Sequence, residues 1–322
     1  MATYKTYADA EPAAVGQRED LSNTIYNIAP TETPVVSSIG KTKATATYHE
    51  WQTDDLAPAN TNALIEGADA DDAEVTPTVR IGNRTQIQGK TVHISGTLDA
   101  VDKAGRKTET AYQLAKSGQE LKRDMEKTIL SNQVQTAGST GQARTLAGIQ
   151  TWLESNYVGG ADGVAGSDGT TARVDGTNAP FTEDMLKKCV KSVFENGGNP
   201  TMLVVPPAQK QVVSTFAGIA EQRYEAPKSS ATTIIGAADV YLSDFGTLSV
   251  VPDRFMTAEA DGGEQALVLD PTMASIATLR PFQSNLLAKA GDSEKHQMLV
   301  EYTLQVSNEK AHGIIADLSV PA

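Results

Sequence analysis

The sequence predicts an α+β protein in which one long helix separates extended arms from a compact body. Three patterns support this fold class. A helical period runs without proline from Gly105 to about Gln135, short apolar strands alternate with helices after residue 181, and longer alternating strands follow residue 275. The 322 residues are long enough for two or three domains.

Composition narrows the class of function. The net charge of −13 disfavours general attraction to nucleic acid, because phosphate binding needs an excess of Lys and Arg. The one cysteine, Cys189, excludes an intrachain disulfide framework and a cysteine-based zinc site. The sequence shows neither a transmembrane run nor a signal peptide, so we expect a cytosolic chain without membrane contact.

Residues 1–40 are polar and contain three prolines. Asp20 could cap a short helix that runs to Ile28, where Ala29-Pro30 would stop it. The segment has too little apolar mass for a core of its own, so it is either a disordered tail or an arm that orders on a neighbour.

Residues 41–100 predict an extended two-stranded ribbon. Strand patterns cover residues 43–52 and 84–98, and about thirty polar and small residues connect them. A connection of this length is usually functional or mobile, and such a ribbon is not stable alone in water. We therefore expect it to lie on another subunit.

The connection contains an acidic run. It lacks the residue order of a calcium loop, so a solvated and self-repelling loop is the simplest interpretation. A sharper hypothesis is that the run meets Lys or Arg of a neighbouring subunit, in which case neutralising it should weaken assembly in a salt-dependent way. The run consists of Glu66, Asp69, Asp71, Asp72 and Glu74.

The long helix has one apolar face. At ~1.5 Å per residue its length would be roughly 45 Å, which suggests that it lies along the protein rather than inside it. The predicted face consists of Ala111, Leu114, Gly118, Leu121, Met125 and Ile129.

Residues 146–157 predict a short amphipathic segment around Leu146, Ile149, Trp152 and Leu153. The six glycines in residues 158–180 predict a surface loop.

The compact body begins near Phe181. Thr182 is a good N-cap for a helix that ends at Asn196-Gly197-Gly198, and an apolar strand at 202–205 precedes a second helix from Ala208. This order indicates an α/β layer. Residues 221–236 should form a loop, and strands are expected at 240–242, 248–251, 266–269, 275–279, 298–306 and 313–318.

The sequence gives no sign of catalysis, cofactor binding or metal binding. Phosphate-binding and nucleophile motifs are missing, and none of the four histidines (His49, His93, His296, His312) has a partner four residues on. We expect each histidine to lie on a strand face or at the surface, and Cys189 to be a buried structural thiol. Asp54-Asp55 should end a strand rather than form an acid/base pair. Lys187, Lys188 and Lys191 should form a solvated face. Asn83-Arg84-Thr85 matches a glycosylation sequon but carries no meaning without a signal peptide.

Many short stretches, in order along nearly the whole chain, resemble the major capsid proteins of tailed bacteriophages with the Hong Kong 97-like fold. They include GQREDLSNTIYNIAPTETP at 16–34, HEWQTDDLAPANTNALIEG at 49–67, NRTQIQGKTVHISGTLDAVDKAG at 83–105, QELKRDMEKTILSNQ, LVVPPAQKQVVSTF, LSDFGTLSVVPDR, LLAKAGDSEK and LQVSNEKAHG. The resemblance implies an N-terminal arm (1–40), an extended E-loop (41–100), a peripheral domain with its spine helix (101–136), an axial domain (137–271), and strands that return to the peripheral sheet (272–322).

The resemblance also implies a structural function. Copies would form pentamers and hexamers of an icosahedral head that encloses double-stranded DNA without sequence-specific binding, assembled in the host bacterial cytoplasm. A separate scaffolding protein is expected, because the arm motif begins by residue 16, together with a portal and a decoration protein. No lysine–asparagine crosslink is expected at Lys41, Lys43 or Lys90. Intersubunit contacts are expected at Trp51, Asp54, Asp55, Glu66, Asp69, Asp71, Asp72, Arg84, Lys122 and Arg123.

Two rival functions remain. An encapsulin-like nanocompartment would share the fold but hold a protein cargo. A soluble enzyme using Asp54, Asp55 or a histidine would be a monomer or small oligomer with a concave site and perturbed carboxylates.

Overall fold

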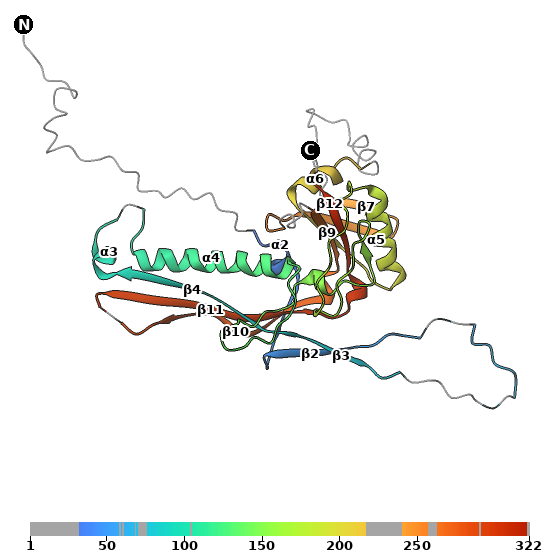
Figure 1. Ribbon diagram of the computed structural model, residues 1–322, viewed down its shortest axis with the longest axis horizontal. Coiled ribbons are helices and arrows are strands. Elements are labelled where there is room, and N and C mark those ends of the chain that lie inside the picture. Colours follow the sequence, from blue (N-terminus) through green and yellow to red (C-terminus); the bar gives the residue numbers. More distant parts are fainter. Residues whose placement is uncertain are drawn as a thin grey trace, which may run out of the picture.

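The computed structural model describes residues 32–57, 59, 61–67, 69, 76–103, 105–216, 240–256, 263–289 and 291–320. Figure 1 shows three parts: a long flat layer of strands beneath α4, a rounded body that contains α5 and α6, and a β2–β3 ribbon that points away from both. Three predictions fall outside the described residues: the helix at 20–28, the loop at 221–236, and the part of the acidic run made by Asp71, Asp72 and Glu74.

A four-stranded sheet forms the flat layer. Its strands are, in spatial order, β1 (Gly40–Lys43), β10 (Ala274–Leu286), β11 (Ser293–Val306) and β4 (Gln86–Ser95). β1 runs parallel to β10, and the other two pairings are antiparallel. Tyr302, Leu304 and Val306 alternate into the core as the sequence predicted.

The long helix, α4 (Glu109–Leu130), is shorter than expected at both ends. The carboxylate of Asp99, in the short helix α3 (Gly96–Ala100), accepts the N–H groups of Glu109 and Thr110 at 2.9 and 3.3 Å, so the helix begins there. At ~1.5 Å per residue it spans about 33 Å.

The predicted face of α4 is correct near its C-terminal end and wrong near its start. Leu121, Met125 and Ile129 are buried, but Ala111 is exposed while Glu109 is buried. The buried positions follow four-residue steps, each of which turns about 40° around the helix axis. The contact stripe therefore rotates along the helix, consistent with packing on a twisted sheet.

A six-stranded sheet forms the rounded body, with cores on both faces. Two helices accompany this sheet, α5 (Glu183–Glu195) and α6 (Pro207–Val213). Three short 3-10 helices also belong to the described chain: η2 (Ile149–Thr151), η3 (Pro271–Met273) and η4 (Glu309–Ala311). Its strands are, in spatial order, β5 (Tyr157–Val158), β12 (Gly313–Ser319), β9 (Gly263–Leu269), β6 (Met202–Val205), β8 (Gly246–Pro252) and β7 (Val240–Ser243).

Local signals predicted this body well. The side chain of Thr182 accepts the N–H of Met185 at the start of α5, and Gly197 has a φ of +86° just beyond its end. The apolar run of β6 is buried throughout, because Met202 and Val204 face one core while Leu203 and Val205 face the other.

β12 corrects the expectation that all three C-terminal strands return to the sheet beside the long helix. It pairs with β9 and β5 in the six-stranded sheet. The physical reason is its apolar sequence, since Ile314 and Ala316 face one core while Ile315 and Leu318 face the other.

The ribbon also differs from the one expected, in which strands at 43–52 and 84–98 would pair. β2 (Tyr48–Thr53) pairs with β3 (Val79–Arg84), whereas residues 86–95 turn into the four-stranded sheet as β4. Thr85 lies at the change of direction, with its hydroxyl hydrogen-bonded to buried Glu301 at 2.9 Å. The sequence pattern continues across this point, so it could not locate the break.

The glycine-rich stretch 158–180 is irregular and exposed in part, as expected of a surface loop, but it is held more closely to the body than a loop prediction implies. It folds back against residues 132–151 and β12. A Cβ atom on Gly166 would lie 2.7 Å from the Cα of Thr151 and 2.9 Å from the carbonyl oxygen of Gln150. At such positions glycine permits close packing of the backbone. The adjoining prediction at 146–157 is confirmed, since Leu146, Ile149, Trp152 and Leu153 are buried.

Candidate assembly surfaces and the networks that position them

The β2–β3 ribbon is fixed firmly at its base. The rings of Trp51 and Trp152 pack with 5.4 Å between centroids, and His49 Nε2 lies 3.0 Å from Gln305 Oε1. Lys310 Nζ donates to Asp55 Oδ2 at 2.6 Å just beyond the end of β2. These contacts hold the first part of the ribbon on its own subunit.

Asn83 is the most deeply placed anchor of the ribbon. Its Nδ2 donates to the carbonyl oxygens of Leu304 and Ala147 at 2.7 and 3.1 Å, and its Oδ1 accepts the N–H of Ala147 at 2.8 Å. The side chain is completely buried. The sequence drew attention to this residue only as part of a sequon, so its role was missed.

Beyond this base the ribbon offers apolar side chains to solvent. Leu56 is 98% exposed, and Leu64 and Ile65 are each 81% exposed. Figure 1 shows that the described residues of the connection, 54–57 and 61–67, extend well away from the rounded body and the flat layer. Large apolar side chains so placed bury almost no apolar area within the isolated subunit.

The expected contact residues fall into two groups within the subunit. Arg84 stacks on Tyr48 at 5.0 Å and Arg123 stacks on Phe255 at 5.4 Å, so both, like Trp51, already have partners in their own chain. The exposed members are Asp54, Asp55, Glu66, Asp69 and Lys122, and of these Asp55 also pairs with Lys310.

A buried carboxylate joins the ribbon end to the flat layer. Glu301 of β11 accepts hydrogen bonds from Thr85 and Arg144 on one oxygen and from Arg280 Nε, at 2.7 Å, on the other. Arg144 also donates to the carbonyl oxygen of Thr85 at 2.5 Å. Two arginines from different segments therefore compensate one buried charge.

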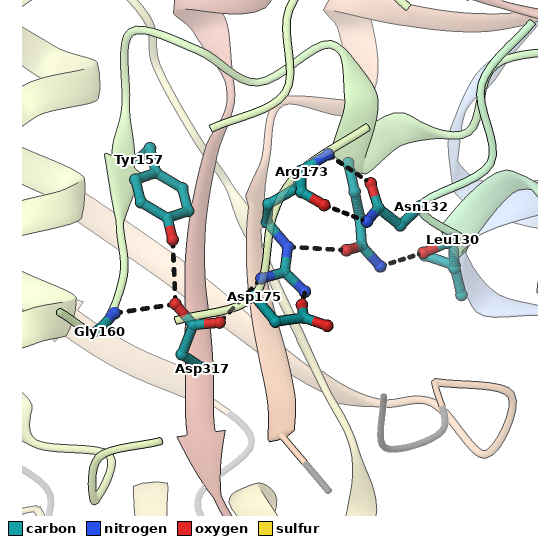
Figure 2. A network of polar contacts seen from close by, with 8 residues as sticks. Leu130, Asn132, Tyr157, Gly160, Arg173, Asp175 and Asp317 are labelled. Carbon is teal, nitrogen blue, oxygen red and sulfur yellow. Dashed lines mark hydrogen bonds and ion pairs between the residues drawn. The ribbon is translucent and has the colours of Figure 1, made fainter. Parts of the chain in front are cut away.

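A second buried network joins the glycine-rich stretch to β12 (Figure 2). Arg173 Nη1 lies 2.9 Å from Asp317 Oδ1, and Arg173 Nη2 lies 2.6 Å from Asp175 Oδ1. The Tyr157 hydroxyl and the Gly160 N–H donate to Asp317 Oδ2 at 3.0 and 2.9 Å. Asp317 has a φ of +58° within a bulge of β12, which turns its side chain toward this network.

The pKa values of this network favour a charged Asp317. Burial would raise the pKa of Asp317, but the Gly176 and Gly160 N–H groups, the Tyr157 hydroxyl and Arg173 together lower it. Burial and the neighbouring Asp317 raise the pKa of Tyr157 to about 12, so its hydroxyl remains a donor. A single acid in the otherwise apolar strand GIIADLS was the one sequence signal of this site.

The histidine and cysteine expectations have mixed outcomes. His312 is completely buried, which corrects the strand-face or surface assignment, and burial lowers its pKa to about 4. Its Nδ1 accepts the N–H of Asp270 at 3.2 Å, while Nε2 lies 3.4 Å from the Met273 carbonyl oxygen, so the ring is neutral. Cys189 is buried as predicted, and burial raises its thiol pKa to about 12.

The remaining sequence expectations concern solvated groups and absences. β2 ends at Thr53, directly before Asp54, so the predicted strand end is confirmed. The predicted solvated face is also confirmed, because Lys187, Lys188 and Lys191 are exposed. Among the described residues, no three His, Cys, Asp or Glu side chains gather as metal ligands. No helix in the described part of the chain is long and apolar enough to cross a membrane.

Solved structures with the same architecture cover nearly the whole chain. An encapsulin complex from Synechococcus elongatus gives a TM-score of 0.58 at 11% identity, covering 100% of this chain and 98% of that one. A chain from Gordonia phage Cozz gives 0.61 at 11% identity, covering 98% and 96%. The capsid of a native GTA particle gives 0.62 at 13% identity, covering 98% and 100%. The fold is therefore the Hong Kong 97-like fold of shell-forming capsid proteins.

Sequence comparison identifies the family within this class. The family described as SU10 major capsid protein matches residues 3–319, and the chain belongs to that family. A relative, the major capsid protein of Escherichia phage Phieco32, is 36% identical over 196 residues. That match covers 58% of this chain and 55% of the relative, so it spans about half the length of that protein.

Proposed function

We propose that copies of this chain form pentamers and hexamers, which close into the icosahedral head of a phage around double-stranded DNA. The observation that carries the proposal is the β2–β3 ribbon. Its anchored base and its nearly fully exposed Leu56, Leu64 and Ile65 are suited to contact with an adjacent subunit. Family membership supports the same conclusion.

The parts of the chain take the following roles in this proposal. Residues 1–40 are the N-terminal arm, 41–100 contain the E-loop, 101–136 contain the spine helix, and 137–271 form the axial domain. Residues 272–306 belong to the peripheral sheet, and β12 joins the axial body because it pairs with β9. The ten contact residues retain their proposed role, with Trp51, Arg84 and Arg123 acting through the shape of their own subunit.

The net charge of −13 suits a container for DNA, because repulsion from phosphate limits sticking during packaging. The proposed role is structural, without catalysis or a cofactor. The proposed partners are other copies of the chain, a separate scaffolding protein, a portal and a decoration protein, with assembly in the bacterial cytoplasm.

Sedimentation of the full chain followed by negative-stain microscopy tests the proposal. We expect pentamers, hexamers or closed shells, either alone or on addition of the scaffolding protein. A chain that remains monomeric at high concentration with scaffold present would overturn the proposal and favour a search for a substrate.

The encapsulin-like function is the second candidate, because an encapsulin shares the fold over the whole chain. The contents of purified shells distinguish the two functions. Nuclease-protected double-stranded DNA in shells from infected cells supports the phage head, whereas a single protein cargo without DNA supports the nanocompartment.

A further inference from the structure

Glu126 of α4 holds a segment far from it in the sequence. Its Oε1 accepts the N–H of Val35 at 2.7 Å, and its Oε2 accepts the N–H of Val36 at 2.8 Å. These N–H groups belong to the first turn of α2 (Pro34–Ser38), which otherwise has no side-chain cap. Glu126 is 0% exposed, so its two oxygens are withdrawn from water and committed to this short segment.

A second buried carboxyl group lies against the first. Asp253 follows the last residue of β8 and is also 0% exposed. Its Oδ1 accepts the N–H of Phe255 at 2.7 Å, while its buried Oδ2 has no donor among the described residues. The Asp253 side chain is within hydrogen-bonding reach of Glu126. Two carboxylates cannot bond to each other unless one of them carries a proton.

Within the part of the chain that the structure describes, few charged groups are placed to offset two buried anions. α2 contributes no charged side chain, and its buried Val35 belongs to one apolar cluster with Met125, Ile129 and Met256. On α4 itself, Asp124 and Lys127 are exposed, and Arg123 stacks on Phe255. Arg254, next to Asp253, is exposed. Two full negative charges in such a site would cost far more than one charge and one proton.

We propose that Glu126 and Asp253 share one proton, and that this proton fastens residues 33–39 to the long helix and to the end of β8. The two N–H donors stabilise negative charge on Glu126. The proton is held between the two groups, so that one carboxyl group donates to the other and the otherwise unpaired Oδ2 of Asp253 gains a partner. Loss of the proton to water leaves two adjacent anions, and their repulsion loosens residues 33–39 from α4 and β8.

The pH dependence has a definite sign. Burial, and next the bond to Asp253, raise the pKa of Glu126 from 4.5 to about 8, although the Val36 and Val35 N–H groups oppose the shift. A raised carboxyl pKa means that the fastened state binds the proton more tightly than the open state. Fastening is therefore strongest below about pH 4.5, and it weakens as pH rises toward 8.

Hydrogen exchange of the peptide that covers residues 33–39, measured in the full chain between pH 5 and 9, tests the proposal. After correction for intrinsic exchange rates, the opening constant should rise by up to about tenfold per pH unit below pH 8 and level off above it. Asp253→Asn places a permanent N–H donor opposite Glu126, so its opening constant should remain low and independent of pH.

Two further variants keep the test decisive. Asp124→Asn changes an exposed carboxylate on the same helix and should keep the pH slope of the wild-type protein. Glu126→Gln, whose amide can donate to Asp253, should abolish the slope even if Asp253→Asn fails to fold. A wild-type opening constant that is independent of pH, or a slope that persists in Glu126→Gln, would overturn the proposal. None of these outcomes depends on whether the chain builds a shell.

Discussion

Arg173 and Asp317 form an ion pair in which both side chains are completely buried, with 2.9 Å between Nη1 and Oδ1. They lie 144 residues apart in the sequence, and their pairing closes the glycine-rich stretch over β12. Breaking such a pair leaves one charge without compensation in a site that water does not reach.

Arg173→Met should therefore lower the free energy of unfolding by about 3–5 kcal/mol. Urea denaturation of the unassembled chain measures the effect. The double variant Arg173→Met, Asp317→Asn should recover part of the loss, because no buried charge remains. Lys191→Met breaks an exposed pair with Glu195 and should change the stability by less than about 1 kcal/mol. Equal effects of Arg173→Met and Lys191→Met would contradict the assigned role of the buried pair.

His312 should make the protein less stable in mild acid. The folded state keeps the ring neutral to a pKa of about 4, whereas the unfolded chain takes up a proton below about 6.5. Stability is therefore fully present above pH 6.5 and falls as pH decreases toward 4, by on the order of 3 kcal/mol. The measurement is the urea midpoint of wild type and His312→Gln at several pH values, with His93→Gln as the exposed control. A wild-type protein whose pH dependence matched that of His312→Gln would rule out this assignment.

Asn83→Asp should be severely destabilising. The substitution replaces the amide donor with an acceptor that faces the carbonyl oxygens of Leu304 and Ala147. We expect a loss of about 3 kcal/mol or more, because a buried charge would face two unsatisfied acceptors. Thermal unfolding measures it, and the exposed Asn285→Asp serves as the matched control. Similar losses in both variants would argue against Asn83 as the anchor of the ribbon.

The two exposed residues Leu64 and Ile65 should matter for assembly and not for folding. The double change to aspartate should leave the unfolding midpoint of the free subunit within about 0.5 kcal/mol of wild type, since neither side chain is buried there. Shell yield in sedimentation should fall sharply. Leu64→Met with Ile65→Val retains apolar character and should assemble normally. Unimpaired assembly of the aspartate variant would remove the ribbon connection from the proposed interface.

Two glycines should respond to alanine with opposite signs. Gly166→Ala forces a methyl group against the backbone of Gln150 and Thr151 and should cost about 1–3 kcal/mol. Gly118→Ala, inside α4, meets only the Met298 side chain at 3.6 Å and should stabilise the protein by about 0.5–1 kcal/mol. Chemical denaturation of both variants provides the comparison, and a shared sign would contradict the packing described here.

The sequence predicted elements whose signals are local. Thr182 and Gly197 mark the two ends of α5, and the apolar run at 202–205 marks a strand that is buried on both faces. It could not separate β3 from β4, because the break depends on the contact of Thr85 with Glu301, 216 residues away. The buried partners of Asn83 and Arg173 were missed for the same reason. Glycines that permit close packing look identical in sequence to glycines that permit a mobile loop.

The strand order of both sheets has a consequence for synthesis on the ribosome. α4 and β4 leave the ribosome well before β11, the strand that lies between β4 and β10 in the sheet. β12 likewise occupies an inner place in the second sheet, although it follows every other described strand in the sequence. The four-stranded sheet cannot close until β11 has left the ribosome, and the six-stranded sheet cannot close until β12 has, so the apolar face of α4 waits for more than 160 residues of synthesis before β11 is available. Nascent chains crowded on one message would be exposed to mispairing during this interval, and chaperone binding should concentrate there.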